Sequence, residues 1–269
     1  MTNRKTFIIG YVLSAVVLLA AYEAKACTNF LATRGATTDG STFITYAADA
    51  HGLYGDMIFY PSADYALGST IDFYENGKLN RAVRQVPHTL NVVGYINEYQ
   101  VAIGESTFDG REELFGIDGI NYPAMIHIAL QRAHNARKAI KIMIDLVDEY
   151  GYRNSGESFS IADPNEVWIM ELVGKGRPEY DTVKGKAVLK KGYKGFKEGA
   201  VWVARRIPDG CVCAHANQSR ITTFPLESKG SHKSISSNSM QHLYDPEVEC
   251  IYAADVITLA RLRGYFTGK

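Results

Sequence analysis

The sequence predicts an α+β fold in which antiparallel sheets are covered by helices. Two observations lead to this class: several pairs of strand-like runs are joined by short turns, and the helical patterns occur in separate blocks. Short connections favour antiparallel pairing, because parallel neighbours need long crossovers. A hydrophobic fraction of 46% and 17 tyrosines indicate a globular domain with a substantial core.

Residues 1–26 are predicted to be a secretory signal peptide. A positively charged start precedes an apolar stretch over residues 7–21, and an A-x-A cleavage site ends at Ala26. The apolar stretch is shorter than the roughly 20 residues that a membrane-spanning helix needs. Residues 27–269 are then expected to form one exported domain, periplasmic or extracellular, with no stable membrane association after cleavage.

Strand pairs are predicted where β-rich runs flank turn residues such as Asp-Gly and Asp-Pro-Asn. The connections are too short for anything but hairpins. The predicted pairs are 28–34 with 42–48, 90–96 with 100–104, and 158–162 with 166–173, and a further pair is expected at 200–205 and 211–216.

One long helix is predicted between Pro123 and Gly151, because apolar residues recur there at three- and four-residue spacing. Proline suits a first helical turn, and glycine suits the stop after a last one. A shorter helix is expected at about 246–263. Residues 174–199 are rich in glycine and lysine, which indicates an exposed excursion, and the chain has no internal repeat.

Charge and cysteine content narrow the function classes. The chain has 29 basic and 29 acidic residues and no basic run, which argues against a nucleic-acid partner. Four cysteines are too few for a disulfide framework in a chain of this length. Cys211 and Cys213 form only a weak C-x-C metal signal. Whether Cys211, Cys213 or Cys250 form disulfides is open, as is the oligomeric state.

Cys27 directly follows the predicted cleavage site, so cleavage would give one residue both a thiol and an α-amine. The amine has a pKa of about 7.7–8 and the thiol about 8.5, so the amine can accept the thiol proton and later return it. Lipid attachment, a disulfide and catalysis are the possible fates of Cys27, and Lys25 fits lipoprotein cleavage poorly. A partnership with His51 or His215 is less favoured, because the amine already supplies a base.

The stretch "CTNFLATRGATTDGSTFITYAADAHGLYGD" from Cys27 resembles the opening of the cysteine-type dipeptidases (dipeptidase A and PepD type) of the N-terminal-nucleophile hydrolase superfamily. The resemblance continues through 102–114, 129–140, 149–176 and 201–221. It implies a four-layer αββα sandwich with Cys27 at the head of a central strand. It also implies hydrolysis of a peptide or related amide bond without a metal or other cofactor. Family members usually continue well beyond residue 269, so a C-terminally shortened, incomplete sandwich is expected.

The resemblance also implies roles for single residues. Asp49 matches the family aspartate that holds the α-amine of Cys27, and a carboxylate there would raise the basicity of the amine. Tyr46 stands where many superfamily members carry arginine, which leaves open how a substrate carboxylate or the thiol is stabilised. Asn217, in "HANQSR", is similar to the side-chain donor of an oxyanion hole; its alternative is a turn cap.

Two more charged residues have open roles. Arg220 is expected to bind a substrate carboxylate by a bidentate contact, or to assist the nucleophile, with a surface salt bridge as the alternative. Glu105, in "GEST", is expected either to receive a substrate ammonium group or to be solvated at a hairpin end. The predicted catalytic set is Cys27, Asp49, Asn217 and Arg220, with Tyr46 and Glu105 as substrate contacts.

These observations predict a cysteine dipeptidase whose partner is a small peptide substrate. An amidase acting on N-acyl amino acids, bile-salt conjugates or penicillin-type amides is the nearest alternative, because it uses the same N-terminal cysteine. A lipid-anchored surface binding module and an inactive fragment are alternatives from other classes.

Overall fold

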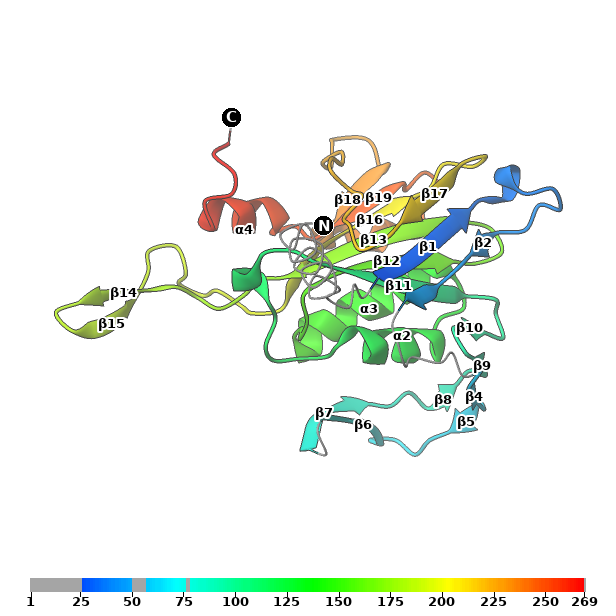
Figure 1. Cartoon of the computed structure of the whole chain (residues 1–269), viewed down its shortest axis with the longest axis horizontal. Coiled ribbons are helices and arrows are strands. Elements are labelled where there is room, and N and C mark those ends of the chain that lie inside the picture. Colours follow the sequence, from blue (N-terminus) through cyan, green and yellow to red (C-terminus); the bar gives the residue numbers. More distant parts are fainter. Residues whose placement is uncertain (1–25, 50–56, 76–77, 269) are drawn as a thin grey trace, which may run out of the picture.

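The computed structural model describes residues 26–49, 57–75 and 78–268 (Figure 1). These residues form a mixed α and β molecule that consists mostly of strands, with few helices. The coarse class therefore agrees with the α+β prediction. The predicted signal peptide, residues 1–26, lies outside the described residues except for Ala26. Within the described ranges, no helix is both long enough and apolar enough to span a membrane.

The larger of the two main sheets has nine strands. Neighbouring strands pair antiparallel, except for the first two named below, which pair in parallel. In spatial order the strands are β18 (Ser234–Ser236), β19 (Cys250–Tyr252), β16 (Ala200–Arg206), β13 (Val167–Gly174), β12 (Gly156–Ala162), β11 (Ala102–Asp109), β10 (Ile96–Asn97), β9 (Val92–Val93) and β4 (Phe59–Tyr60).

The smaller main sheet is built around β1 (Ala26–Ala32). On one side β1 pairs with β17 (Val212–His215), and on the other with β2 (Phe43–Ile44) and β3 (Ala47–Asp49), all antiparallel. The predicted pairing of 28–34 with 42–48 is confirmed. The strands predicted at 200–205 and 211–216 exist, but their pairing is wrong, because β16 lies in the large sheet and β17 in the small one.

Three two-stranded ribbons and three 3₁₀ helices complete the described elements. The ribbon at 180–189 has every residue exposed, which confirms the predicted excursion. The ribbons are β5 (Ala63–Asp64) with β8 (His88–Thr89), β6 (Thr70–Glu75) with β7 (Lys78–Arg84), and β14 (Tyr180–Val183) with β15 (Lys186–Leu189); the 3₁₀ helices are η1 (Arg34–Ala36), η2 (Glu112–Leu114) and η3 (Ser237–His242).

Two helices, α2 (Tyr122–Leu130) and α3 (Ala136–Tyr150), stand where one long helix was predicted. The apolar spacing runs through the break, so periodicity alone does not reveal it. Two asparagines enforce the break: Asn135 caps α3 by accepting from Lys138 N, and Asn97 Nδ2 donates to the carbonyls of Leu130 and Ala133. The predicted stop at Gly151 is confirmed, with a φ of 78° that favours glycine.

Other boundaries also differ from prediction. The run at 90–96 is not one strand, because it turns at Gly94 and forms β9 and β10. The helix expected at 246–263 is limited to α4 (Val256–Leu262). Its first part, Cys250–Tyr252, instead forms β19, because the edge of β16 offers backbone hydrogen bonds to this β-prone segment.

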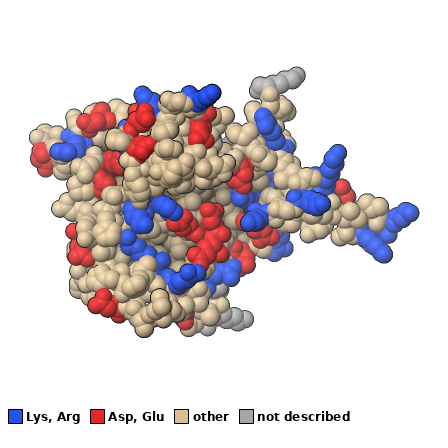
Figure 2. All heavy atoms as spheres, turned by 180° about the vertical axis from the view of Figure 1, so that it is seen from behind, with Lys and Arg blue, Asp and Glu red and all other residues tan. Residues whose placement is uncertain are grey.

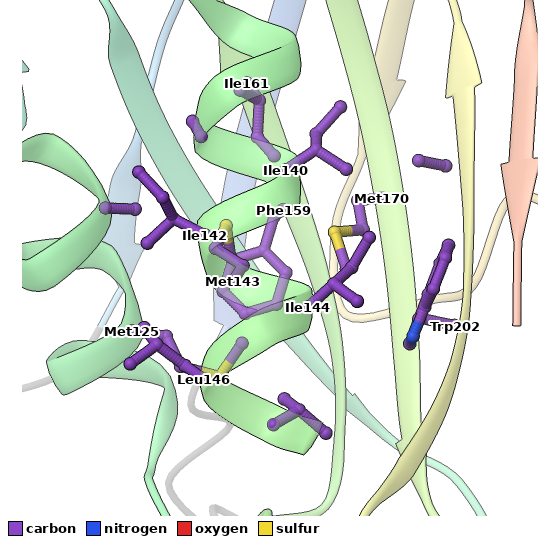
Figure 3. Close-up of a cluster of buried hydrophobic side chains, with 14 of the residues drawn as sticks. Met125, Ile140, Ile142, Met143, Ile144, Leu146, Phe159, Ile161, Met170 and Trp202 are labelled. Atoms are coloured by element: carbon purple, nitrogen blue, oxygen red, sulfur yellow. The ribbon is translucent and has the colours of Figure 1, made fainter. Parts of the chain in front are cut away.

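The hydrophobic core lies between the two long helices and the large sheet (Figure 3). Phe159, Ile161 and Met170 point to the helices from β12 and β13, and they meet Ile140 and Met143 of α3 in one fully buried cluster. At roughly 25 cal/mol per Å² of buried apolar surface, this layer dominates the stability of the fold.

The small sheet packs against the other face of the large one. Leu31 of β1 clusters with Ala162 and Val167, and Asn29 Nδ2 donates to Glu105 O at 2.6 Å. On the outer face of the small sheet, Phe30 and Val212 are 55% and 73% exposed. Helices thus cover the large sheet on one side within the described residues, and the four-layer αββα sandwich remains a prediction.

Basic and acidic side chains are interspersed on the face seen in Figure 2, without one dominant sign. This mixture agrees with the equal numbers of basic and acidic residues.

Candidate active site

Three of the four predicted catalytic residues lie at the head of β1. Asn29 pairs with His215, so the same antiparallel register brings Cys27 opposite Asn217. On the other side of β1, Ala26 pairs with Asp49 and Cys27 with Ala48. The fold therefore brings Cys27, Asp49 and Asn217 together at the backbone level, although 190 residues separate Cys27 from Asn217.

A short hydrogen-bond network fixes this corner. Cys27 N–H donates to Asn217 Oδ1 at 2.5 Å, and Asn217 N–H donates to Ser106 Oγ at 2.8 Å. Ser106 Oγ in turn donates to Cys27 O at 3.3 Å. Ser106 is fully buried on β11. One serine of the large sheet thus holds both Cys27 of β1 and Asn217, which lies in the bend after β17.

The partners of Asn217 determine which way its amide points. Oδ1 must face the Cys27 N–H, which can only donate, and Nδ2 must face Thr107 O at 2.5 Å, which can only accept. One N–H of Nδ2 is left for another acceptor. The backbone of Asn217 has a φ of 48°, a left-handed conformation that asparagine tolerates better than most residues.

Polar side chains fill the layer between the two sheets around this corner. Ser158 Oγ donates to Glu171 Oε1 at 3.3 Å, and Ser160 Oγ lies 2.8 Å from His215 Nε2. Burial, reinforced by the nearby Arg220 charge, lowers the pKa of His215 to about 4. His215 is therefore neutral at pH 7.

A buried acid pair lies on the opposite face of β11. Glu105 and Glu157 are 1% and 0% exposed, and they lie on the same face of the neighbouring strands β11 and β12. Burial and then the Glu105 charge raise the pKa of Glu157 well above its ordinary value. The Tyr46 hydroxyl donates to Glu105 Oε1 at 2.5 Å. Burial, followed by the charges of Glu105, Glu157 and Cys27, raises the pKa of Tyr122.

Of the three residues predicted to contact the substrate, two are hydrogen-bonded to each other and one is exposed. The Tyr46 hydroxyl makes a hydrogen bond to the Glu105 carboxyl group. The alternative prediction, that Glu105 is solvated at a hairpin end, is wrong, because its side chain is buried. Arg220 is exposed, and its backbone N–H donates to Glu171 Oε1. The catalytic role of Arg220 stays a prediction.

Sequence reasoning missed Ser106 and Glu157. The alternation in "GEST" is the available signal for Ser106, because a serine that follows a buried glutamate in a strand must face the other side. No local signal marks Glu157, whose role depends on a neighbouring strand. Of the remaining residues considered, His51 lies outside the described residues, and Cys211, Cys213 and Cys250 are unpaired thiols.

Comparison with known proteins gives a family match over most of the chain. Residues 26–250 match the model of peptidase family C69. A probable dipeptidase from Latilactobacillus sakei is 26% identical over 253 residues, covering 84% of this chain and 47% of that protein. A probable dipeptidase from Salmonella dublin is 23% identical over 260 residues, covering 88% and 54%. The chain thus spans about half the length of the curated relatives it matches.

Proposed function

The chain belongs to peptidase family C69, and we propose that it is an exported cysteine dipeptidase that hydrolyses dipeptides or very short peptides. The family match confirms the resemblance carried by the segment that starts at Cys27. The observation that carries the proposal is the hydrogen bond from Cys27 N–H to Asn217 Oδ1, which brings the expected nucleophile on β1 next to an amide donor in the bend after β17.

Signal cleavage after Ala26 is the first step of this proposal. It converts the backbone N–H of Cys27 into an amine, which can accept a proton as an amide nitrogen cannot. The A-x-A sequence supports a cut at this position, and export to the periplasm or the exterior follows from it. Asp49, whose backbone pairs with Ala26, is proposed to hold the amine and raise its basicity.

The chemistry then proceeds in two acyl transfers. The amine takes the thiol proton, and the Cys27 sulfur attacks the scissile carbonyl carbon. The resulting ammonium gives that proton to the leaving nitrogen as the C–N bond breaks, which leaves a thioester on Cys27. A water molecule, deprotonated by the same amine, attacks the thioester and releases the acid and the thiol.

Asn217 is proposed to serve two groups at once. Its Oδ1 orients the amine of Cys27, and the remaining N–H of Nδ2 is available to the oxyanion. Loss of one oxyanion donor typically lowers the rate by about 10²–10³-fold. The left-handed backbone of Asn217 and the bond to Ser106 hold the amide in this orientation before substrate binds.

The acid pair is proposed to recognise the ammonium group of the substrate. The two carboxyl groups lie on neighbouring strands, and burial strengthens the attraction between a carboxylate and a cation. The Tyr46 hydroxyl donates to Glu105 Oε1, and Tyr46 is proposed as a further substrate contact. Arg220 is proposed to bind the substrate carboxylate. The four-layer αββα sandwich of the superfamily is the proposed complete architecture.

Replacement of the nucleophile tests the proposal directly. The chain that begins at Cys27 is expected to hydrolyse members of a dipeptide panel, and Cys27→Ala is expected to abolish turnover while thermal unfolding is unchanged. Cys27→Ser is the matched variant, with a hydroxyl in place of the thiol and reduced activity. Undiminished turnover by Cys27→Ala would rule out the assignment of the nucleophile.

Two further measurements separate the alternatives. Glu105→Gln is expected to raise KM for a dipeptide with an unblocked amine, and to leave an N-acyl amino acid unaffected. Preference of the parent chain for the N-acyl substrate would instead indicate an amidase. Mass spectrometry of the mature N-terminus tests the lipid-anchored alternative, since a diacylglyceryl group on Cys27 would exclude the amine mechanism.

A further inference from the structure

Two histidines and an aspartate converge at the edge of the large sheet, on elements that the proposed hydrolysis does not use. His232 precedes β18, His242 ends η3, and Asp245 follows in the next turn. In the sheet order, β18 is five strands away from β11, which carries Ser106 and Glu105. This cluster is therefore separate from the candidate active site.

The ligand atoms point toward one another. His232 Nδ1 lies 2.6 Å from Asp245 Oδ2, and His242 Nδ1 lies 3.1 Å from the same oxygen. One potential ligand atom from each of the three residues lies within 4.8 Å of the other two. In a tetrahedral zinc site, with bonds of about 2.0–2.1 Å to each ligand, neighbouring ligand atoms are about 3.3 Å apart. The distance from His242 Nδ1 to Asp245 Oδ2 is within a few tenths of an ångström of this value. The distance from His232 Nδ1 to the same oxygen is shorter and would have to lengthen when a metal binds.

The two imidazole rings lie against each other at a tilt of 35°, with ring centroids 3.7 Å apart. Glu247 Oε1 lies 3.9 Å from His232 Nδ1 and offers a fourth ligand. The ligand side chains are 34–52% exposed, so an ion can enter from solvent.

Buried interactions hold the backbone that carries these ligands. Arg137, 6% exposed, donates to the carbonyls of Leu243 and Asp245 at 2.8 and 2.7 Å. Its guanidinium is fixed in turn by a bidentate ion pair with Glu166. Next to His232, the carbonyl of Lys233 accepts from two backbone N–H groups of the β19 segment. A site whose supports are rigid binds a metal with little reorganisation.

From this geometry we propose that His232, His242 and Asp245 form a binding site for a late divalent transition metal, with Zn²⁺ as the expected ion. Imidazole and carboxylate ligands suit zinc, whereas magnesium and calcium prefer sites of oxygen ligands alone. The ion ties the segment before β18 to the turn after η3. It takes no part in the amide hydrolysis.

Calorimetric titration of the chain that begins at Cys27 with Zn²⁺ alone tests the proposal. One ion per chain is expected, with thermal unfolding shifted upward as Zn²⁺ increases. His242→Ala and Asp245→Ala are each expected to weaken binding by about 100-fold, since even the loss of a supporting residue typically costs about 10–100-fold. His88→Ala is the matched control, because His88 also pairs with a carboxylate, Asp64, but without a second histidine; it is expected to bind Zn²⁺ like the parent chain.

Cobalt absorption identifies the ligands if the alanine variants fail to fold. Co²⁺ at this site is expected to give visible bands without the near-ultraviolet thiolate band, and His242→Gln is expected to remove them. A thiolate band, which would assign the ion to cysteines such as Cys211 and Cys213, would overturn the proposal. Equal Zn²⁺ affinity of the parent chain and His242→Ala, or no saturable binding by the parent chain, would overturn it as well. None of these readouts depends on peptide hydrolysis.

Discussion

The two faces of the middle of β12 are equally buried but chemically opposite. On β12 and β13, Phe159, Ile161 and Met170 face the helices, whereas the alternating Ser158 and Ser160 face the small sheet. Apolar burial stabilises the first face directly. A buried polar face contributes little to stability and requires a partner for each group. The side of the large sheet that faces the helices therefore supplies most of the stability of the fold. The side that faces the small sheet is costly to bury, and it positions the candidate catalytic residues.

Removing a large side chain from the helix face should have the largest effect. Phe159→Ala is expected to lower the free energy of unfolding by about 3–5 kcal/mol, because it removes apolar contacts and leaves a cavity. Ser158→Ala, the adjacent residue on the other face, is expected to cost about 1 kcal/mol. Urea denaturation measures both. Equal losses would contradict the assignment of stability to the helix face.

Removing the Asn217 side chain should lower catalysis strongly and stability only slightly, which is the reverse of the effect expected for Phe159→Ala. Asn217→Ala is expected to lower kcat/KM for a dipeptide by about 10²–10³-fold, and to reduce stability by only about 1 kcal/mol, since the side chain is half-buried. Gln218→Ala is the control, because Gln218 is the exposed neighbour. An unchanged rate for Asn217→Ala would remove Asn217 from the catalytic set.

The stability that comes from the layer between the two sheets should decrease in acid. The pKa of His215 falls from 6.5 to about 4 on folding, so its contribution to stability is complete above pH 6.5 and is lost as pH falls toward 4. The expected loss over this interval is about 1–3 kcal/mol. His215→Gln should flatten this part of the pH profile of urea midpoints. An identical slope in parent and variant would show that His215 does not carry the linkage.

Ser106 should show the smallest effect. Ser106→Ala removes the hydroxyl that bridges Cys27 O and Asn217 N, so it is expected to cost about 1 kcal/mol of stability. The same change should lower dipeptide turnover by about tenfold, equivalent to about 1.4 kcal/mol in the barrier. Ser160→Ala is the control, because Ser160 is an equally buried serine whose hydroxyl contacts His215 and neither Cys27 nor Asn217. A Ser106→Ala variant with parental turnover would show that the bridge is not needed.

Local signals predicted the β12–β13 hairpin well, because both alternation and the turn at Asp163 lie within one short segment. The break at Asn135 was missed, because bonds from Asn97 and Asp163, far along the chain, enforce it. The segment at Cys250 fits helix or strand by composition, and the neighbouring strand β16 decides between them.

The candidate site shows the same limit. Cys27 and Asn217 could be singled out from their sequence contexts, but their direct bond depends on a register between strands that are distant in sequence. The pairing of Glu105 with Glu157 depends on a strand neighbour too. Residue type therefore predicts which groups are reactive, and tertiary pairing determines which groups meet.

Dipeptide hydrolysis by two chains that differ by one residue tests the central claim most directly. One chain begins at Cys27, and the other retains Ala26, with both N-termini verified by mass spectrometry. The thiol is present in both chains, but only the first has a basic amine on Cys27. The account predicts turnover by the first chain and none by the second, and equal turnover by the two chains would contradict it.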